Sequence, residues 1–383
     1  MVFTSGARAV GEANSAGGSS GQAAEADCSV EVLQRSEDRE RFEVECQRAG
    51  VKLPVSYRLA WDGLVPSEGQ WLVAVRSPTG LPAAALMARA HGTRAVPGHR
   101  VLRVERFGMT GDDAAVSAAV AALARVARLH SRILRVHLEL FSPSEDRRAL
   151  IGRAAARVGF QRQYACRMYE RTVAIDLAPS EDRIFRSLHP TARRHIRSLT
   201  KHPVMVAPIA ELQCAARLDE LERETLARTG GKSAQPNWRR IIAFAREQPG
   251  LARLVGLFRT DRTDDSTLVA FALGLNHGTE VEYCLAGSAR PADLRIPMGY
   301  GLAWDLIQWG KGLGASWFDF GGIVAEHPNG AVHRGDGVSQ FKRYFTHTEI
   351  SVGEEWVLVI APVRSAVATY VARAADWVRR VRH

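Results

Sequence analysis

The sequence predicts an α/β chain built from two similar mixed-sheet domains in tandem. One order of strands and helices occurs twice along the chain, and 383 residues suffice for two domains that each bury a core. The composition, with 46% hydrophobic and 24% charged residues, is that of an ordinary globular protein. No apolar run is long enough for a membrane-spanning helix, so none is expected.

The first copy of this order precedes Asp176 and defines a first domain over residues 29–178. Its elements are, in chain order, two apolar strands around a Ser-Pro-Thr-Gly turn (70–90), a third strand (101–108), a helix with Val116, Val120, Leu123 and Val126 on one face, a buried strand (133–141), a helix that closes at Gly159-Phe160, and a long strand region through Asp176.

The second copy defines a second domain over residues 251–362. Its elements are a hairpin (252–260 and 267–278), a third strand (280–288), a helix with Leu302, Leu306, Trp309 and Leu313 on one face, a buried strand (316–322), a short helix (338–345) and a final strand pair (347–360). The two copies match in the order of their elements and not in residue identities, which indicates two α/β domains of similar topology.

The remaining segments flank or connect these domains. Residues 1–28 are rich in Ala, Gly and Ser and are expected to form a disordered tail. Residues 179–250 are expected to be a mostly helical connection. Residues 363–383 are typical of an amphipathic helix whose inward face carries Val367, Val371, Ala374 and Val378.

Charge and cysteine usage limit the partners and the compartment. A net charge of +10 favours polyanionic partners, either nucleotide-bearing molecules or, through peripheral contact, an anionic membrane. The five cysteines are scattered and lack a CxxC pair, which favours a reducing cytoplasm over disulfides. The twelve histidines show no HExxH spacing, so we expect neither a metal nor a cofactor.

Residues 317–345 carry the clearest chemical pattern. An apolar strand runs into Gly321-Gly322, and the helix-like run after the following loop carries Phe341 and Lys342. A strand that hands over to a helix through glycines gathers backbone N–H groups around one point, which suits an oxyanion. Only five of the 51 lysines and arginines are lysines, so Lys342 is an unusual choice of cation here. The alternative is a solvated lysine after a turn.

A helix beginning at Pro190 carries a second cationic pattern. Arg193, Arg197 and Lys201 follow each other at intervals of four residues, so they would share one face of that helix. Like charges at this spacing repel by a few tenths of a kcal/mol per pair, which a phosphate ligand would offset. The alternative is a solvated basic face with acidic neighbours.

The first domain's helix-Gly-Phe-strand closure resembles the acyltransferase domain of the GNAT superfamily. The second half, over about residues 180–362, resembles the Fem family of aminoacyltransferases. The residues that carry the Fem resemblance are the helix Pro190–Lys201, the segment Glu224-Thr225-x-x-Arg228-Thr-Gly-Gly231, the strand end Glu282-Tyr283-x-x-x-Gly287-Ser288, the turn Asp319-Phe-Gly-Gly322, and Phe341-Lys342 before Tyr344-Phe345.

The resemblance implies a fold and an activity. Fem enzymes consist of two GNAT-like domains, and some insert a helical hairpin near residues 225–240, where this chain has no room for a coiled-coil insertion. The family is cytoplasmic and transfers an amino acid from aminoacyl-tRNA to an amine of a peptidoglycan precursor. The implied partners are therefore aminoacyl-tRNA and an amine acceptor, either a cell-wall precursor or an intermediate of a peptide natural product.

The resemblance also implies roles for single residues. Lys342 would stabilise the oxyanion of ester aminolysis, and Phe341 would stack on the terminal adenine. Tyr283 and Asp319 would orient the amine, although Asp319 also suits a carboxylate that caps the following turn. The substrate-binding set is completed by basic residues: Arg193, Arg197, Lys201 and Arg228. As an alternative, Phe341 is a core residue at the base of its helix.

The loop before the helix that carries Leu302 bears on the donor. Coenzyme-A-binding GNAT domains place Arg or Gln before x-x-Gly-x-Gly/Ala, whereas Arg295 lies one residue too far from Gly299 and Gly301. This departure favours a tRNA ester over an acyl-CoA. Two alternatives stay open, an acyl-CoA-dependent N-acyltransferase and a non-catalytic RNA- or membrane-binding protein. The sequence does not identify the amino acid or the acceptor.

Overall fold

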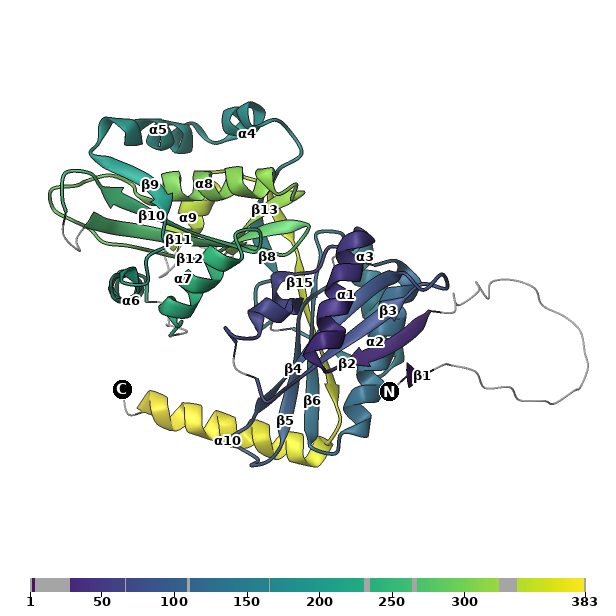
Figure 1. The fold of residues 1–383 in the computed structure, drawn as a ribbon. Helices are drawn as coiled ribbons and strands as arrows, with labels where there is room; N and C mark the ends of the chain where they lie inside the picture. Colours follow the sequence, from purple (N-terminus) through teal and green to yellow (C-terminus); the bar gives the residue numbers. More distant parts are fainter. Residues whose placement is uncertain are drawn as a thin grey trace, which may run out of the picture. The chain divides into compact units, whose positions relative to one another are not determined.

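The chain forms two compact units, each built around one mixed sheet (Figure 1). The structure, a computed structural model, describes residues 2–3, 28–65, 67–108, 111–164, 166–230, 235–263, 267–323 and 336–381. The first unit comprises Met1–Leu53, Ser67–Arg167 and Gly353–His383, and the second comprises Pro54–Pro66 and Met168–Val352. The predicted α/β class with two tandem mixed-sheet domains is confirmed.

The sheet of the first unit has one parallel contact, between β5 and β6, and its other neighbours run antiparallel. Its strands, in spatial order, are β1 (Val2–Phe3), β2 (Ser29–Leu33), β3 (Gly69–Arg76), β4 (Pro82–Gly92), β5 (Arg100–Phe107), β6 (Ile133–Phe141), β15 (Gly353–Val359) and β7 (Gln161–Gln163). The helices of this unit are α1 (Ser36–Arg48), α2 (Asp113–Leu129), α3 (Glu145–Arg157) and α10 (Pro362–Val381). Helix α2 supplies much of the core, since its apolar face packs on the sheet.

The sheet of the second unit repeats this pattern, with a parallel contact between β12 and β13 and antiparallel contacts elsewhere. Its strands, in spatial order, are β14 (Glu349–Ser351), β8 (Arg171–Asp176), β13 (Trp317–Gly322), β12 (Glu280–Ser288), β11 (Leu268–Asn276), β10 (Ala252–Arg259) and β9 (Val204–Pro208). The helices are α4 (Glu181–Ser187), α5 (Pro190–Ser198), α6 (Cys214–Thr229), α7 (Trp238–Glu247), α8 (Gly299–Gly312) and α9 (Asp336–Arg343), and the short 3-10 turns are Val55–Tyr57, Leu59–Trp61 and Leu199–Lys201.

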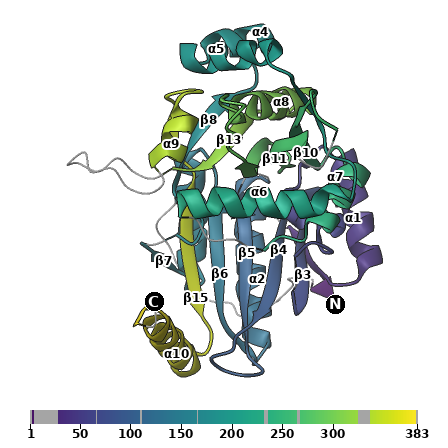
Figure 2. The ribbon, with the colours of Figure 1, turned by 90° about the vertical axis from the view of Figure 1, so that its left-hand side faces the viewer.

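The second sheet is covered on both faces. Successive side chains of a strand point to opposite faces. On β10, Val255 therefore packs in one core with α8 and α4, and Leu254 packs in another with α6 and α7. Figures 1 and 2 show α8 and α6 on opposite sides of this sheet. Any site between α6 and α8 must therefore open at an edge or at the end of a strand.

The two copies share one topology, but their last strands are exchanged. The order β3-β4-β5-β6-β15-β7 in one sheet corresponds to β10-β11-β12-β13-β8-β14 in the other. Strand β8, the last strand of the first copy in sequence, pairs with β13 in the second sheet, and β15, the last strand of the second copy, pairs with β6 in the first. The expected strand region through Asp176 and the expected pair over 347–360 are therefore each divided between two sheets. An apolar pattern shows that a strand is buried but not which sheet buries it.

Three other expectations differ from the structure. Residues 179–250 are not only a helical connection, because β9 forms the edge of the second sheet and α4 to α7 cover its faces. On α10, Val367, Val371 and Ala374 are exposed, Ser365 and Ala368 are buried instead, and the side chain of Val378 lies outside the described residues. Of the expected disordered tail, residues 1 and 4–27 lie outside the described residues, and Val2–Phe3 pairs with β2. No helix in the described part of the chain has the length and apolar character needed to cross a membrane.

Candidate functional site

The site begins where two parallel strands of the second sheet separate. Strands β12 and β13 pair through three positions, the last being Glu282 opposite Asp319. Beyond this point β12 continues along β11, with an irregularity in register near Cys284, while β13 ends in Gly321-Gly322. Gly321 has φ +74°, which glycine adopts without strain. Tyr283 is thus the first β12 residue beyond the positions that pair with β13.

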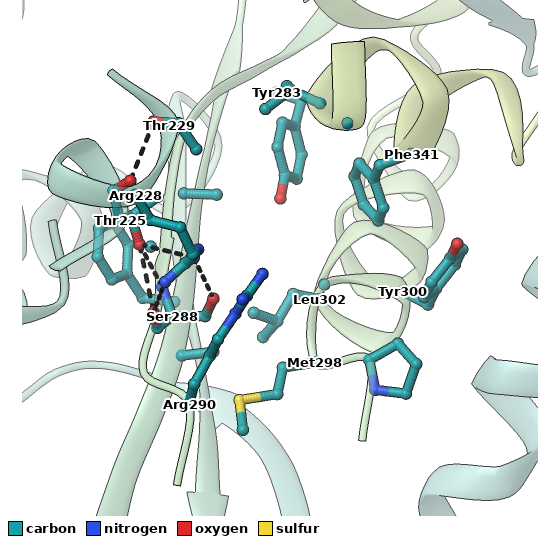
Figure 3. Close-up of a pocket in the computed structure, with 18 of the residues that line it drawn as sticks. Thr225, Arg228, Thr229, Tyr283, Ser288, Arg290, Met298, Tyr300, Leu302 and Phe341 are labelled. Atoms are coloured by element: carbon teal, nitrogen blue, oxygen red, sulfur yellow. Dashed lines mark hydrogen bonds between the residues drawn. The ribbon is translucent and has the colours of Figure 1, made fainter. Parts of the chain in front are cut away.

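A cavity of about 510 Å³ lies next to this separation, within the second unit. It is lined by the last turns of α6, the end of β12, the start of α8 and helix α9, as Figure 3 shows for most of the lining residues. This volume falls in the range of small-molecule sites, about 300–1,000 Å³. Four residues predicted from the sequence line it: Arg228, Tyr283, Phe341 and Lys342.

Lys342 is the buried cation of this cavity. Its side chain is only 8% exposed, and Nζ donates a hydrogen bond of 2.6 Å to the carbonyl oxygen of Gly322. Burial lowers the pKa of Lys342 to about 8, while Asp319 and Glu282 raise it in part. The ammonium is therefore held by one neutral acceptor and two nearby carboxylates, which is not the solvated lysine of the alternative reading.

Asp319 lies under the cavity and does not line it. Its carboxylate is fully buried: Oδ1 accepts from Thr172 Oγ1 (2.5 Å) and the Gly321 N–H (2.7 Å), and Oδ2 accepts from the Tyr169 hydroxyl (2.6 Å). A carboxylate with three such donors fixes the turn that carries the acceptor of Lys342. This arrangement fits the turn-capping reading of Asp319 better than direct contact with an amine.

A second carboxylate extends this network away from the cavity. Glu282 Oε2 lies 3.1 Å from His277 Nε2, and Glu282 Oε1 lies 3.4 Å from the Tyr169 hydroxyl. These contacts connect His277, Glu282, Tyr169 and Asp319 around the last paired position of β12 and β13. Buried polar groups connected in this way hold one another in fixed orientations.

Aromatic rings form the wall opposite α6. Phe341 meets Tyr300 at 5.1 Å between ring centroids and Phe345 at 5.4 Å, both edge to face. Both readings of Phe341 therefore hold in part, because its ring joins the core and also lines the cavity. In Figure 3 the Tyr283 hydroxyl points into the cavity, and burial raises the pKa of Tyr283, so the phenol stays protonated.

Two guanidinium groups lie across the cavity from these rings. Arg228, on the last turn of α6, donates to the carbonyl and to the hydroxyl of Ser288, each at 3.3 Å. Arg290 follows the end of β12 and extends into the cavity beside Arg228 (Figure 3). The pKa of Arg228 is lowered, first by burial and then by the charge of Arg290. The two cations are thus close enough to interact.

The other predicted basic residues lie outside the cavity. Helix α5 ends at Ser198 and continues as a 3-10 turn, so Lys201 does not extend the face of Arg193 and Arg197 as expected. Arg193 donates to the Arg186 carbonyl, and Arg197 stacks over Phe185 at 5.1 Å. Both side chains therefore pack against α4.

Sequence reasoning missed part of the site. Tyr169 belongs to a segment assigned to the other domain, and no local pattern marked its contact with Asp319. Arg290 is one of many arginines in loops, and Met298 and Tyr300 lie in a segment whose recognisable motif consists of Arg295 and the glycines at 299 and 301. Gly231, the last residue of the predicted segment 224–231, and residues 324–335, the loop within 317–345, lie outside the described residues. Within the described part of the chain, no group of His, Cys, Asp or Glu side chains is placed to hold a metal ion.

Comparisons with known proteins agree with this architecture. Residues 186–343 match the family model described as an acetyltransferase (GNAT) domain. The structure resembles FemX with a TM-score of 0.70 and 12% identity, covering 88% of this chain and 100% of FemX. It resembles L-PGS from Bacillus licheniformis with a TM-score of 0.52 and 14% identity, covering 86% and 96% of the two chains.

A conserved protein of unknown function from Bacteroides thetaiotaomicron VPI-5482 shares the fold with a TM-score of 0.50 and 13% identity, covering 86% of this chain and 98% of that one. A sequence comparison with curated proteins gave no match. At these identities the structural likeness shows a common fold. The Fem-type fold of two GNAT-like domains, predicted from the sequence, is confirmed.

Proposed function

We propose, from the Fem-type fold and the GNAT domain of its second unit, that this protein is a cytoplasmic aminoacyltransferase. It would move an amino acid from aminoacyl-tRNA to an amine of a peptidoglycan precursor or of a peptide natural-product intermediate. The observation that carries this proposal is the buried ammonium of Lys342 in a cavity of small-molecule size. Such a cation suits a reaction that develops negative charge on oxygen.

Aminolysis of an ester develops that charge. The acceptor nitrogen attacks the ester carbonyl carbon, and the carbonyl oxygen becomes an oxyanion in the tetrahedral intermediate. When the intermediate collapses, the C–N bond remains as the amide and the ribose hydroxyl leaves with a proton that the amine releases. Lys342 would face the oxyanion and the Tyr283 hydroxyl would donate to a polar group of the substrate, while Asp319 holds the turn beneath them.

The aromatic wall supports a nucleoside ligand. Phe341 presents its ring to the cavity, and edge-to-face contacts with Tyr300 and Phe345 hold this ring in place. A base stacked on such a ring contributes about 1–3 kcal/mol to binding. The terminal adenosine of tRNA would occupy this position, with its ester carbonyl near Lys342.

The same ring favours a tRNA ester over an acyl-CoA. Phe341 carbons lie 3.1 Å from the position that a Cβ atom on Gly299 would take, so the ring packs against the first turn of α8. Acyl-CoA enzymes of the GNAT superfamily hold pyrophosphate at this helix N-terminus. Arg295 is exposed and does not line the cavity.

A donor comparison tests the proposal. With the acceptor amines held constant, charged tRNAs are compared with acyl-CoA thioesters, each with and without ribonuclease, and amide products are identified by mass spectrometry. We expect products only from charged tRNA, and we expect ribonuclease to abolish them. Turnover that resists ribonuclease and depends on an acyl-CoA would instead support the acyl-CoA-dependent N-acyltransferase.

Helix α10 favours peripheral contact with a membrane as part of the function. Its exposed large apolar residues are Val363, Val367, Tyr370, Val371 and Trp377, which follow helical spacing along one side. The same helix contains four arginines and one aspartate, which favours anionic lipid. The protein should co-sediment with phosphatidylglycerol vesicles and not with phosphatidylcholine vesicles. Absence of binding to phosphatidylglycerol vesicles would refute the contact.

A further inference from the structure

The cavity of the second unit has a second charged end, formed by Arg228 and Arg290. Arg228 comes from α6 and Arg290 from the loop after β12, and both line the cavity. Figure 3 shows the Arg228 and Arg290 side chains on the side opposite Phe341 and below Tyr283. The proposed reaction uses Lys342 and the rings at the other end. It gives this pair no chemical role.

Among the described residues, neither guanidinium forms an ion pair. The hydrogen bonds of Arg228 go to the neutral oxygens of Ser288 and Thr225. The carboxylates that share a hollow with Arg290 are engaged elsewhere. Glu224, one turn before Arg228 on α6, raises the pKa of Arg228 in part but lies 3.7 Å from Arg217, and Asp293 pairs with Arg259 at 2.8 Å and Arg262 at 2.7 Å. In the described part of the chain, two adjacent guanidinium groups thus line the cavity without an ion-pair partner within salt-bridge distance.

We propose that Arg228 and Arg290 form a subsite for a phosphate group of the acyl donor. A guanidinium presents paired N–H donors that match phosphate oxygens, and two guanidinium groups that repel one another gain most from an anion between them. The cavity then has a phosphate end at Arg228 and Arg290, and its other end carries Lys342 and the aromatic rings. A nucleotide that carries an acyl group offers a group to each end, a phosphate to the first and an acylated nucleoside to the second.

This inference rests on the proposed acyl transfer and specifies its donor. The phosphate could belong to the terminal nucleotide of an aminoacyl-tRNA or to coenzyme A, and the chemistry of the subsite is the same for both. A carboxylate on the side chain of an acidic aminoacyl group is a different ligand. The experiment separates these three.

Binding of matched ligands provides the test. The probes are 3′-aminoacylamido-adenosine, a stable analogue of the aminoacyl ester, with and without a 5′-phosphate, and they are titrated by calorimetry. For the intact protein the phosphate should tighten binding by about tenfold to a hundredfold, the range of one or two charge-assisted hydrogen bonds. In Arg290→Gln and in Arg228→Gln most of this gain should disappear, while binding of the unphosphorylated analogue stays within twofold.

Arg295→Gln is the matched control. Arg295 lies in the same loop as Arg290, is also exposed, and does not line the cavity, so this variant should keep the full phosphate gain. Equal melting temperatures of the three variants would exclude loss of the fold as a cause. A phosphate gain that is unchanged in Arg290→Gln, or lost equally in Arg295→Gln, would overturn the subsite.

A second pair of ligands separates the subsite from the proposed function. Coenzyme A and pantetheine differ in their phosphates, and they are titrated against the same variants. If the phosphate gain depends on Arg290 only for coenzyme A, the subsite stands and the tRNA donor fails. If Arg290→Gln weakens only analogues with an acidic aminoacyl group, whether or not they carry phosphate, the ligand is a carboxylate and the proposal fails. Absence of any phosphate gain in both pairs also refutes it.

Discussion

At the residue scale, Lys342 should separate catalysis from stability. Burial disfavours its ammonium by more than Asp319 and Glu282 favour it, which is why its pKa is lowered, so removal of the charge costs the fold little. Loss of a group that stabilises an oxyanion typically costs about 10²–10³ in rate. We therefore expect Lys342→Ala to lower kcat by this factor with charged tRNA as donor, while circular dichroism and the melting temperature change little.

Lys311→Ala is the matched control for this substitution. Lys311 lies on α8 in the same unit, donates to the Leu177 carbonyl at 3.1 Å, and does not line the cavity. It should keep near-normal turnover. If Lys342→Ala also turned over normally, Lys342 would be a structural residue and the oxyanion role would be wrong.

The pKa of Lys342 predicts an alkaline limb in the pH–rate profile. Oxyanion stabilisation needs the charged form, so kcat/KM should fall as pH rises through about 8. Arginine keeps its charge above this pH, so Lys342→Arg should have a lower rate without this limb. In the unfolded chain Lys342 has a pKa of 10.5, so between pH 8 and 10.5 the unfolded state binds more protons than the folded state. The free energy of unfolding should therefore rise with pH over this range. If Lys342→Arg kept the same alkaline limb, the limb would report the titration of another group and the assignment to Lys342 would be wrong.

At the element scale, Gly287 sets the distance between α6 and β12. A Cβ atom there would lie 2.5 Å from a ring carbon of Phe271 and 3.0 Å from the Leu221 carbonyl oxygen. We expect Gly287→Ala to lower the free energy of unfolding by about 1–3 kcal/mol, the usual cost of overpacking. Because a shift of α6 would also move Arg228, the same substitution should lower the affinity for the donor.

Gly312→Ala provides a comparison with the same chemical change. Gly312 is the last residue of α8, and a Cβ atom there would meet nothing within 4 Å. Alanine should raise the free energy of unfolding by up to about 1 kcal/mol, since it favours helix and restricts the unfolded chain. Urea unfolding of both variants measures these opposite signs, and equal effects would contradict the close approach at Gly287.

The elements also show which parts of the site the sequence could predict. The apolar run 316–322, its glycines and the following helix are local patterns, and they predicted Lys342 near the Gly321-Gly322 turn, where its Nζ contacts the Gly322 carbonyl. Tyr169 was out of reach because its contact with Asp319 depends on which sheet receives β8. Arg290 was missed because it differs from other loop arginines only in that the carboxylates near it pair with other arginines.

At the scale of the whole molecule, the duplication was predictable and the exchange of strands was not. The order of elements follows from hydrophobic periodicity, which is read within each segment. Pairing of β15 with β6 joins residues more than 200 positions apart, such as Val359 and Arg135, and no periodicity encodes that choice. The exchange makes the first sheet depend on the C-terminal part of the chain.

Truncation tests this dependence. A chain that ends at Val352 lacks β15, which lies between β6 and β7 in the first sheet, whereas the second sheet keeps all its strands. Amides of β3 to β6 should then lose protection in hydrogen-exchange mass spectrometry, because β6 loses seven paired positions and its edge is opened. Amides of β10 to β13 should stay protected. A chain that ends at Ala361 lacks only α10, retains β15 and should protect both sheets. If the chain that ends at Val352 protects β3 to β6 as well as the longer one does, β15 is not an integral strand of the first sheet.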